Sequence, residues 1–509
     1  MRRTTAAASV VTVLAPLLLA GASTASAAGG SLTVTTLDRA GKPVFAQVAV
    51  YNTKTNDFRF IDSNKATSLP AGSYELVTTI TDATGEASTV GGHNVTVSGT
   101  TKTTFDARQG RAVKVSLSPS PGSGYDHTVS AYVCATDNGP ASMGTSAPAG
   151  ELYVIPTGSK AYQLAYGTTY QPRSETGGDF WVASGMHAGG VPSGVSATLR
   201  QSALTALKVS ARSGPDSGQA RFSFDYSSES GGSCSWGPNS LIFERNLPNS
   251  FTAHLPAGQW QVSQQANDFV YGGWHSYAAG HTTSLTLGHA VWGPSGQLPY
   301  TWYKQLYLGS FNMFADPTLT AGGTLAAGSV KLTHAGKTLY SQKYGPGQEI
   351  DGQPKLPGAG WYTLDTSARR GSLPSGSLST TASLSLHFYA DPGKNQQIRD
   401  YITRFWPNAL NSRNLAAPGS TTSVVLGMQR NGTNDGTITQ LSDGVQSVRA
   451  WYTTDGGTTW HAATTKLSGG KWTMAVHNPG SGRVGLRSTV TDTHHDTSTT
   501  TVYNAYAIG

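Results

Sequence analysis

Apolar and polar residues alternate along this chain with a period of two, which is the pattern of a β-strand that buries one face. One such run places its small and branched residues on a single face: Val44, Ala46, Val48 and Val50. The pattern recurs at 74–78 and 113–117. Dipeptides that favour hairpin turns separate the runs, namely Asn431-Gly432, Asp435-Gly436, Asp443-Gly444 and Asp455-Gly456. The sequence therefore predicts an all-β fold.

One segment favours a helix instead. Ile398, Tyr401, Ile402 and Phe405 are spaced i, i+3, i+4 and i+7, and Pro407 follows them. We expect a short helix here within an otherwise all-β chain.

A turn motif occurs three times. Leu69-Pro-Ala-Gly-Ser-Tyr-Glu-Leu76 is repeated as Leu255-Pro-Ala-Gly-Gln-Trp-Gln-Val262 and, with one extra residue, as Leu356-Pro-Gly-Ala-Gly-Trp-Tyr-Thr-Leu364. Pro and Gly make a tight turn into a strand, and the aromatic residue packs on the sheet. The motif predicts at least three β-sandwich modules.

Composition divides the chain into four modules behind a leader. A Pro/Ser/Gly linker begins at Ser118, and Gly293-Pro-Ser-Gly296 and Asp391-Pro-Gly393 mark weaker boundaries. We expect a β-sandwich at 28–117, a larger irregular β domain at 118–295, and immunoglobulin-like sandwiches at 296–395 and 396–509. The fold class is thus tandem immunoglobulin-like or prealbumin-like sandwiches.

The first 27 residues have the features of a secretory signal peptide. Arg2-Arg3 is followed by the apolar stretch 10–20 and by the cleavage site Ala25-Ser-Ala27. The apolar stretch is too short for a membrane span, which needs roughly 20 residues. We expect a secreted, extracellular protein without a membrane span after signal removal.

The low and scattered charge argues against nucleic acid as a partner. Only 12% of residues are charged, and the net charge is +7, of which Arg2 and Arg3 contribute two. No run of Lys or Arg is present, whereas a mild attraction to anionic cell-wall polymers is compatible with this balance.

Two cysteines, Cys134 and Cys234, would meet an oxidising environment after export. A disulfide between them is the favoured interpretation, and two unpaired thiols are the alternative. Two cysteines are too few for a metal site, and His494-His495-Asp496 in a polar loop is expected to be solvated. We expect no metal and no cofactor.

The last 60 residues carry a series of short motifs: Val448-Arg-Ala-Trp-Tyr452, Gly470-Lys-Trp472, His477-Asn-Pro-Gly480 and Val484-Gly-Leu-Arg487. Their order resembles the C-terminal region of subtilisin-like serine proteases secreted by high-GC Gram-positive bacteria. Further matches begin at Leu37-Asp-Arg-Ala-Gly-Lys-Pro43 and extend over most of the chain. The resemblance implies the family's non-catalytic β-domains without its catalytic domain.

A subtilisin-type catalytic triad is incomplete in this sequence. Gly144-Thr-Ser-Ala-Pro148 imitates the serine motif at Ser146, but the following Met is missing. Asp216 lies in an aspartate-like motif that comes after the serine, which is the wrong order for the family. None of the histidines is followed by Gly, so the histidine motif is absent. We therefore assign no catalytic residue.

Thr453-Thr-Asp-Gly-Gly-Thr-Thr-Trp460 fits the Asp-box pattern S/T-x-D-x-G-x-S/T-W known from sialidases. In this hairpin Asp455 would accept turn amides, Gly457 would take positive φ and Trp460 would cover the turn. A single copy indicates a structural turn.

The stretch 269–292 is the most aromatic part of the chain, with Tyr271, Trp274, Tyr277 and Trp292. These residues are a candidate face for sugar stacking or protein binding, and packing in a sandwich core is the alternative.

Two functions remain at this point. The favoured one is a secreted non-catalytic protein that binds an extracellular protein or a cell-wall polymer. The other is a serine hydrolase or peptidase-related enzyme with an unrecognised site in 118–295, near Ser146, Asp216 and the loop from His275 to His281.

Overall fold

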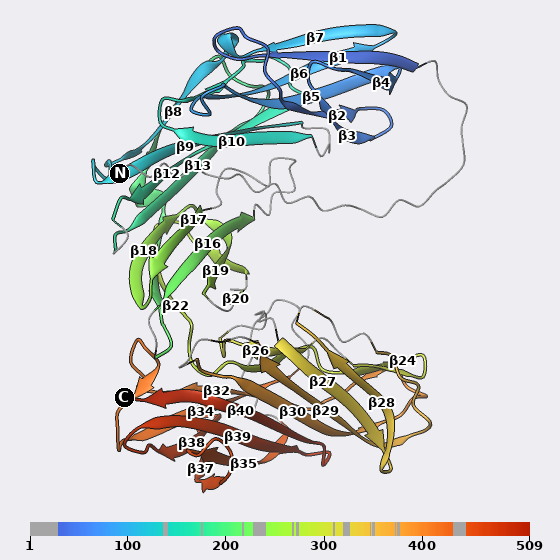
Figure 1. The fold of residues 1–509 in the computed structure, drawn as a ribbon, viewed down its shortest axis with the longest axis vertical. Helices are drawn as coiled ribbons and strands as arrows, with labels where there is room; N and C mark the ends of the chain where they lie inside the picture. Colours follow the sequence, from blue (N-terminus) through green and yellow to red (C-terminus); the bar gives the residue numbers. More distant parts are fainter. Residues whose placement is uncertain are drawn as a thin grey trace.

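The computed structural model describes residues 29–135, 141–174, 177–215, 218–227, 241–266, 269–270, 274–308, 311–318, 326–346, 348, 352–371, 373, 377–430 and 444–509. In this part of the chain the only helical elements are two 3₁₀ turns, Ala107–Gln109 (η1) and Gln201–Ala203 (η2). All other elements are strands, arranged in three lobes along the long axis of the molecule (Figure 1). The prediction of an all-β fold is confirmed.

The N-terminal lobe has three layers. Its cover sheet has the order β4-β1-β7 and consists of β1 (Gly29–Leu37), β4 (Ala66–Pro70) and β7 (Thr100–Asp106). Its central sheet has the order β14-β8-β11-β6-β5-β2-β3 and consists of β2 (Gln47–Asn52), β3 (Phe58–Asp62), β5 (Gly72–Thr81), β6 (Ser88–Val97), β8 (Arg111–Ser118), β11 (Leu152–Val154) and β14 (Val195–Arg200). The third layer belongs to the sheet that continues into the middle lobe.

The central sheet is buried on both faces, which alternation alone does not predict. Val48 and Val50 of β2 pack in the core beneath the cover sheet. Ala49 and Tyr51, on the opposite face of the same strand, pack in the core toward the third layer. A small residue such as Ala49 thus occupies a second core and does not face solvent.

A bridging sheet connects the N-terminal lobe to the middle lobe. Its order is β10-β9-β12-β13-β18-β15-β22, with β9 (Tyr125–Ala135), β10 (Ser142–Pro148), β12 (Tyr162–Pro172), β13 (Phe180–His187), β15 (Thr205–Ala211), β18 (Asn249–Leu255) and β22 (Thr282–Leu287). Its second half packs on the middle sheet, formed by β16 (Gln219–Ser227), β17 (Leu241–Asn246), β19 (Gly258–Gln265), β20 (Phe269–Val270) and β21 (Trp274–Tyr277). Phenylalanines and Trp260 fill the core between them.

The C-terminal lobe is built around one broad sheet of nine strands. Its order is β28-β27-β29-β30-β40-β39-β35-β36, with β33 paired to β40, and its strands are β27 (Ala326–His334), β28 (Lys337–Tyr344), β29 (Gly360–Arg370), β30 (Thr381–Ala390), β33 (Leu415–Ala416), β35 (Val445–Thr453), β36 (His461–Ala463), β39 (Gly482–Asp492) and β40 (Thr497–Ile508). Smaller sheets, which cover its inner face, contain β23 (Gly293–Gly296), β24 (Tyr300–Trp302), β25 (Gln305–Tyr307), β26 (Phe311–Ala315), β31 (Gln396–Gln397), β32 (Ile402–Pro407), β34 (Thr421–Gln429), β37 (Thr465–Ser468) and β38 (Lys471–His477). Two apolar cores fill the space between these layers.

Strand pairing crosses two of the expected domain boundaries. β8, which ends at Ser118, pairs with β11 and β14, so residues on both sides of position 117 share the central sheet. β30 pairs with β40 over seven residues, so the expected domains 296–395 and 396–509 share the broad sheet. A Pro/Gly-rich segment therefore marks a chain reversal at these points and not the limit of a sheet.

The expected helix at 398–405 is wrong, because β32 occupies this region. Ile402 packs in one core of the C-terminal lobe and Phe405 in the other. Ile398 and Tyr401 are buried in the irregular segment before β32, and Ile402 and Phe405 lie on opposite faces of the strand, so the apolar residues have helical spacing without a helix.

The three turn motifs share one local structure. In each copy a buried aromatic side chain donates a hydrogen bond to the carbonyl oxygen four residues earlier. Tyr74 Oη donates to Pro70 O at 2.7 Å, Trp260 Nε1 to Pro256 O at 2.9 Å, and Tyr362 Oη to Gly358 O. All three rings lie in apolar cores. The extra residue in the third copy leaves this register unchanged, and Trp361 occupies the outward position held by Ser73 and Gln259.

Candidate functional site

The candidate aromatic residues of 269–292 do not form one face. Trp274 is 46% exposed, whereas Tyr277 is 8% exposed and belongs to the core of the middle lobe. Trp292 packs against the core of the C-terminal lobe, with the guanidinium of Arg370 5.1 Å from its ring centre. Tyr271 lies outside the described residues. Core packing, the alternative interpretation, accounts for Tyr277 and Trp292.

The residues of the hydrolase alternative are also separated. Ser146 is exposed on β10, at one edge of the bridging sheet. His281 directly precedes β22, at the opposite edge. Its Nδ1 is 2.9 Å from Ala279 O in the same turn, and its carbonyl oxygen accepts from the backbone N–H of Ala206 on β15. Six strand spacings of about 4.8 Å separate the two edges. His275 lies on β21 of the middle sheet, and Asp216 lies outside the described residues.

Cys134 is buried on β9, and the described residues include no free cysteine. Its expected partner Cys234 lies outside the described residues, so the disulfide stays a prediction. His494 and His495 lie in the turn between β39 and β40, where His494 Nδ1 is 3.6 Å from Asp492 Oδ2. No group of three or more His, Cys, Asp or Glu side chains in the described ranges is arranged to hold a metal ion.

The Asp-box segment forms the turn between β35 and β36. The backbone N–H of Thr459 donates to Asp455 Oδ1 at 2.9 Å, and the Thr453 hydroxyl donates to the same oxygen at 2.7 Å. These two hydrogen bonds lower the pKa of Asp455 to about 2. Gly457 has φ +98°, and the Trp460 ring stacks beneath the guanidinium of Arg487 at 3.9 Å. The motif holds a hairpin closed at one edge of the broad sheet.

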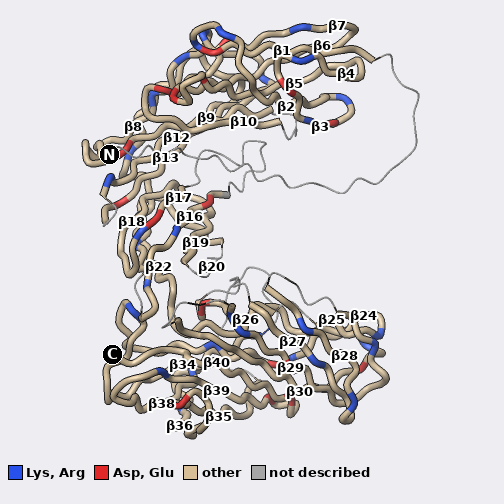
Figure 2. The backbone as a smooth tube through the Cα atoms, viewed as in Figure 1, with Lys and Arg blue, Asp and Glu red and all other residues tan. Residues whose placement is uncertain are grey.

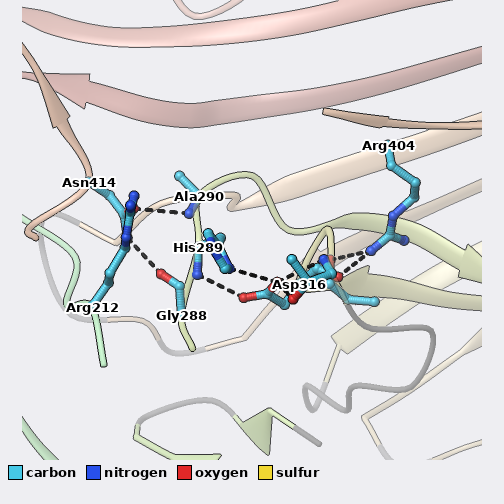
Figure 3. Close-up of polar contacts among 9 residues, drawn as sticks. Arg212, Gly288, His289, Ala290, Asp316, Arg404 and Asn414 are labelled. Atoms are coloured by element: carbon cyan, nitrogen blue, oxygen red, sulfur yellow. Dashed lines mark hydrogen bonds and ion pairs between the residues drawn. The ribbon is translucent and has the colours of Figure 1, made fainter. Parts of the chain in front are cut away.

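A buried polar joint connects the middle and C-terminal lobes (Figure 3). Asn414, at φ +58°, donates from Nδ2 to Ser213 O and Gly288 O, both at 2.8 Å. Its Oδ1 accepts from the backbone N–H of Ala290 at 3.1 Å and from Arg212 at 3.3 Å. One asparagine side chain thus contacts two separate segments, 212–213 and 288–290, and links them to the C-terminal lobe.

Asp316 lies beside the joint with its carboxylate fully buried. Its Oδ2 accepts from the backbone N–H of His289 at 2.7 Å, and Oδ1 accepts from the Thr318 hydroxyl at 2.7 Å. His289 Nδ1 is 3.2 Å from Oδ1. Burial alone would raise the pKa of Asp316, but the contacts with His289 and Thr318 hold it below its ordinary value. These contacts tie the Asp316 carboxylate to His289 and Thr318, on either side of it in the fold.

Asp400 is a second buried carboxyl group, with the opposite pKa shift. Burial, together with the nearby charges of Asp496 and Asp492, raises its pKa well above the ordinary value. A group with a raised folded-state pKa stabilises the fold below the unfolded pKa of about 4, and this contribution is lost as pH rises.

We expect Asp400→Asn to raise the melting temperature at pH 8, because the amide removes a buried carboxyl group that would otherwise ionise. At pH 4 the difference from the wild type should shrink, because about half of the unfolded wild-type carboxyl groups are then protonated as well. Differential scanning calorimetry across this pH range measures both values. An equal effect at pH 4 and pH 8 would contradict the assignment; Asp62→Asn, at an exposed position of β3, is the control.

The outer face of the broad sheet lies on the side away from the two apolar cores of the C-terminal lobe. Strand register aligns its outward side chains in rows across the sheet. One row runs Ser329, Ser367, Ser383, Thr501, Arg487 and Trp451, and the next runs Lys331, Asp365, Ser385, Thr499, Thr489 and Arg449. A third row runs Thr333, Thr363, His387, Thr497, Thr491 and Ser447, beyond which Trp361 lies opposite Tyr389. We call this surface the hydroxyl face.

Hydrogen bonds between neighbouring strands order the hydroxyl face. Thr489 and Thr499 hydroxyls are 2.8 Å apart, and Ser385 donates to Asp365 at 2.6 Å. Thr363 Oγ1 is 2.9 Å from His387 Nδ1, and the His387 ring stacks on Trp361 with centres 5.0 Å apart. Such pairs restrict side-chain rotamers before a ligand arrives, which lowers the entropic cost of binding.

Sequence reasoning missed the hydroxyl face, although one signal for it was present. Trp361 stands where the other two turn motifs carry Ser73 and Gln259, both polar residues. An exposed tryptophan at a position that is otherwise polar in the same repeat needs an explanation beyond packing.

No family model matches this chain, and no curated protein matches it. Among solved structures, a streptococcal ancillary pilin is similar over 56% of this chain and 96% of its own, at 12% identity and a TM-score of 0.15. A trypsin-activated α2-macroglobulin from Escherichia coli is similar over 94% of this chain and 38% of its own, at 9% identity and a TM-score of 0.17. The pilus adhesin SpaC from Lactobacillus rhamnosus GG is similar over 69% and 52%, at 10% identity and a TM-score of 0.11.

These similarities are too low to support an argument about function. None of the three is a subtilisin-like protease, so the comparisons do not support the resemblance drawn from the C-terminal motifs. Within the described ranges, no helix has the length and apolar character required to cross a membrane.

Proposed function

We propose that the chain is a secreted, non-catalytic binding protein that holds an extracellular polymer or protein on the hydroxyl face of its broad sheet. The leader at 1–27 supports export. The observation that carries the proposal is the hydroxyl face itself, where ordered hydroxyls, basic side chains and two exposed aromatic rings share one side of a single sheet.

The rest of the molecule supports this role as a rigid frame. The bridging sheet joins the first two lobes by continuous strand pairing, and the Asn414 joint fixes the third lobe to the second. A rigid frame that presents a preordered face loses little conformational entropy when it binds. The buried carboxylate of Asp316, beside this joint, contributes to the same frame through its contacts with His289 and Thr318.

The test compares the mature chain 28–509 with a variant whose hydroxyl face carries reversed charge, Lys331→Glu with Arg449→Glu. We expect the wild-type protein to sediment with cell envelopes and the variant to remain in solution. The matched control, Lys114→Glu with Arg200→Glu, changes the charge equally on exposed positions of the N-terminal lobe and should sediment like the wild type. Equal sedimentation of all three proteins would show that the hydroxyl face is not the binding surface.

The hydrolase alternative is tested separately. Mature protein is incubated with a fluorophosphonate probe and digested, and labelled peptides are identified by mass spectrometry. We expect no labelled serine; a probe adduct on Ser146 would overturn the proposal of a non-catalytic protein.

A further inference from the structure

The hydroxyl face carries its aromatic side chains at opposite corners. At one corner Trp361 and Tyr389 are 39% and 48% exposed, and their rings meet edge to face at 5.8 Å. At the other, Arg487 stacks on Trp460, whose ring contacts Tyr503 at 5.9 Å. Trp361 and Arg487 lie three strands apart across the sheet and six residues apart along the strand direction. Together these offsets correspond to a distance of about 25 Å. The face is therefore long enough for a linear ligand to contact both corners.

The charge of this face is predominantly basic. Its outward positions include five cationic side chains, namely Lys331, Lys343, Arg369, Arg449 and Arg487, against the single acidic Asp365. Figure 2 shows Lys and Arg positions on β27, β28 and β29 of this sheet. Charge complementarity thus favours an anionic ligand.

The side chains between the two aromatic corners of the hydroxyl face are poorly suited to a protein or a nucleic acid as the ligand. A protein partner needs an apolar contact centre, but the three rows are almost entirely Ser, Thr and charged residues. A nucleic acid needs a dense set of phosphate contacts, and the five cations are spread over five strands. What remains is a ligand that combines many hydroxyl groups with widely spaced negative charges.

We propose that the hydroxyl face binds an acidic polysaccharide whose charge is carried by carboxylates on the sugar rings, that is, a uronic-acid polymer. A ring of this kind presents an apolar face to Trp361 or Tyr389 and hydroxyl groups to the Ser and Thr rows. Its carboxylate matches the forked guanidinium of Arg369 or Arg449. This assignment rests on the proposed function, because it names the ligand of the same surface.

Polygalacturonate is the probe, with dextran as the neutral comparison and a phosphate-bearing polysaccharide as the second anion. Affinity electrophoresis and isothermal titration calorimetry measure binding by the mature chain 28–509. We expect binding to polygalacturonate that weakens as salt rises from 50 to 500 mM, and no binding to dextran. Binding to dextran of equal strength, or a preference for the phosphate-bearing polymer, would overturn the choice of a carboxylate ligand.

Trp361→Gln tests the aromatic corner, because glutamine is the residue that the second turn motif carries at this position. We expect the variant to bind polygalacturonate about tenfold more weakly, because it loses an aromatic stacking contact with a sugar ring. Trp274→Gln is the matched control, since Trp274 is similarly exposed but lies on the middle lobe. Unchanged hydrogen exchange of β29 and β30 shows that Trp361→Gln leaves the fold intact. Equal affinity of Trp361→Gln and wild type would overturn the assignment.

The envelope sedimentation described above separates the two proposals. If the charge-reversed variant loses envelope binding but the wild-type protein ignores polygalacturonate, the binding surface stands and the uronic-acid ligand is wrong. If the wild-type protein binds neither envelopes nor polygalacturonate, both proposals fail.

Discussion

Arg404→Met is expected to lower the free energy of unfolding of the C-terminal lobe by about 3–5 kcal/mol. The Arg404 guanidinium is buried and donates to four backbone carbonyls. Nη1 donates to Gly293 O and to Pro294 O, at 3.3 and 2.6 Å, and Nη2 donates to Ala315 O and Asp316 O, at 3.0 and 2.5 Å. Methionine fills a similar volume but leaves these acceptors buried without a donor. Burial lowers the pKa of Arg404 to about 10, so the side chain stays charged at neutral pH.

Denaturant titration followed by hydrogen exchange measures this loss for each lobe, which a single unfolding curve of a three-lobe protein would not resolve. Arg404→Lys should fall between the wild type and Arg404→Met, because one ammonium group cannot replace the two-pronged guanidinium. Arg449→Met on the exposed hydroxyl face is the control and should change stability by less than about 0.5 kcal/mol. A similar small change for Arg404→Met would mean that water can replace its hydrogen bonds.

Trp260→Ala is expected to destabilise the middle lobe by about 3–5 kcal/mol, the cost of removing a large buried aromatic side chain. Trp260 is completely buried, and its ring packs against Tyr226 with centres 5.0 Å apart. The substitution removes both the core contacts and the hydrogen bond to Pro256 O that closes the turn motif. The same titration measures the loss, and it should appear in β16 to β19 before it reaches the broad sheet.

Conservative variants separate packing from the hydrogen bond in these turns. Tyr74→Phe and Tyr362→Phe keep the ring and remove only the hydroxyl, so each should cost about 1 kcal/mol. Gln259→Ala, next to Trp260 but half-buried on the outward face, is the control for the middle lobe. If Trp260→Ala costs no more than Gln259→Ala, the turn motif is a local feature without a share in core stability.

The sequence predicted the elements more successfully than their assembly. Alternation identifies strands because it depends on neighbouring residues, and the aromatic of each Pro/Gly turn packs as expected. Of the four turn dipeptides, Asp455-Gly456 lies in the turn between β35 and β36, whereas the other three fall wholly or partly outside the described residues. Position 117 was misleading because the partner of β8 lies about 80 residues later in β14. The 398–405 segment failed for a related reason: a strand buried on both faces has no polar side, and local spacing then imitates a helix.

The proposed binding surface was harder to predict because its members are scattered along the chain. Lys331, Trp361, Tyr389 and Arg449 come from four strands and become neighbours only through the register of the broad sheet. The aromatic content of 269–292 attracted attention because it is dense in sequence, yet Tyr277 and Trp292 are used in two different cores. Aromatic residues that are close together in the sequence need not be close together on the surface when strands from distant segments pair.

β40, the last strand of the chain, lies in the middle of the broad sheet, and this position affects how the C-terminal lobe folds. β40 pairs with β30 on one side and β39 on the other, and β33 also adds to it. A chain that stops before Thr497 would leave two half-sheets with open edges, which readily pair with other chains. The C-terminal lobe can therefore close only after β40 has been made, so until then the chain depends on conditions that keep its unpaired strands apart.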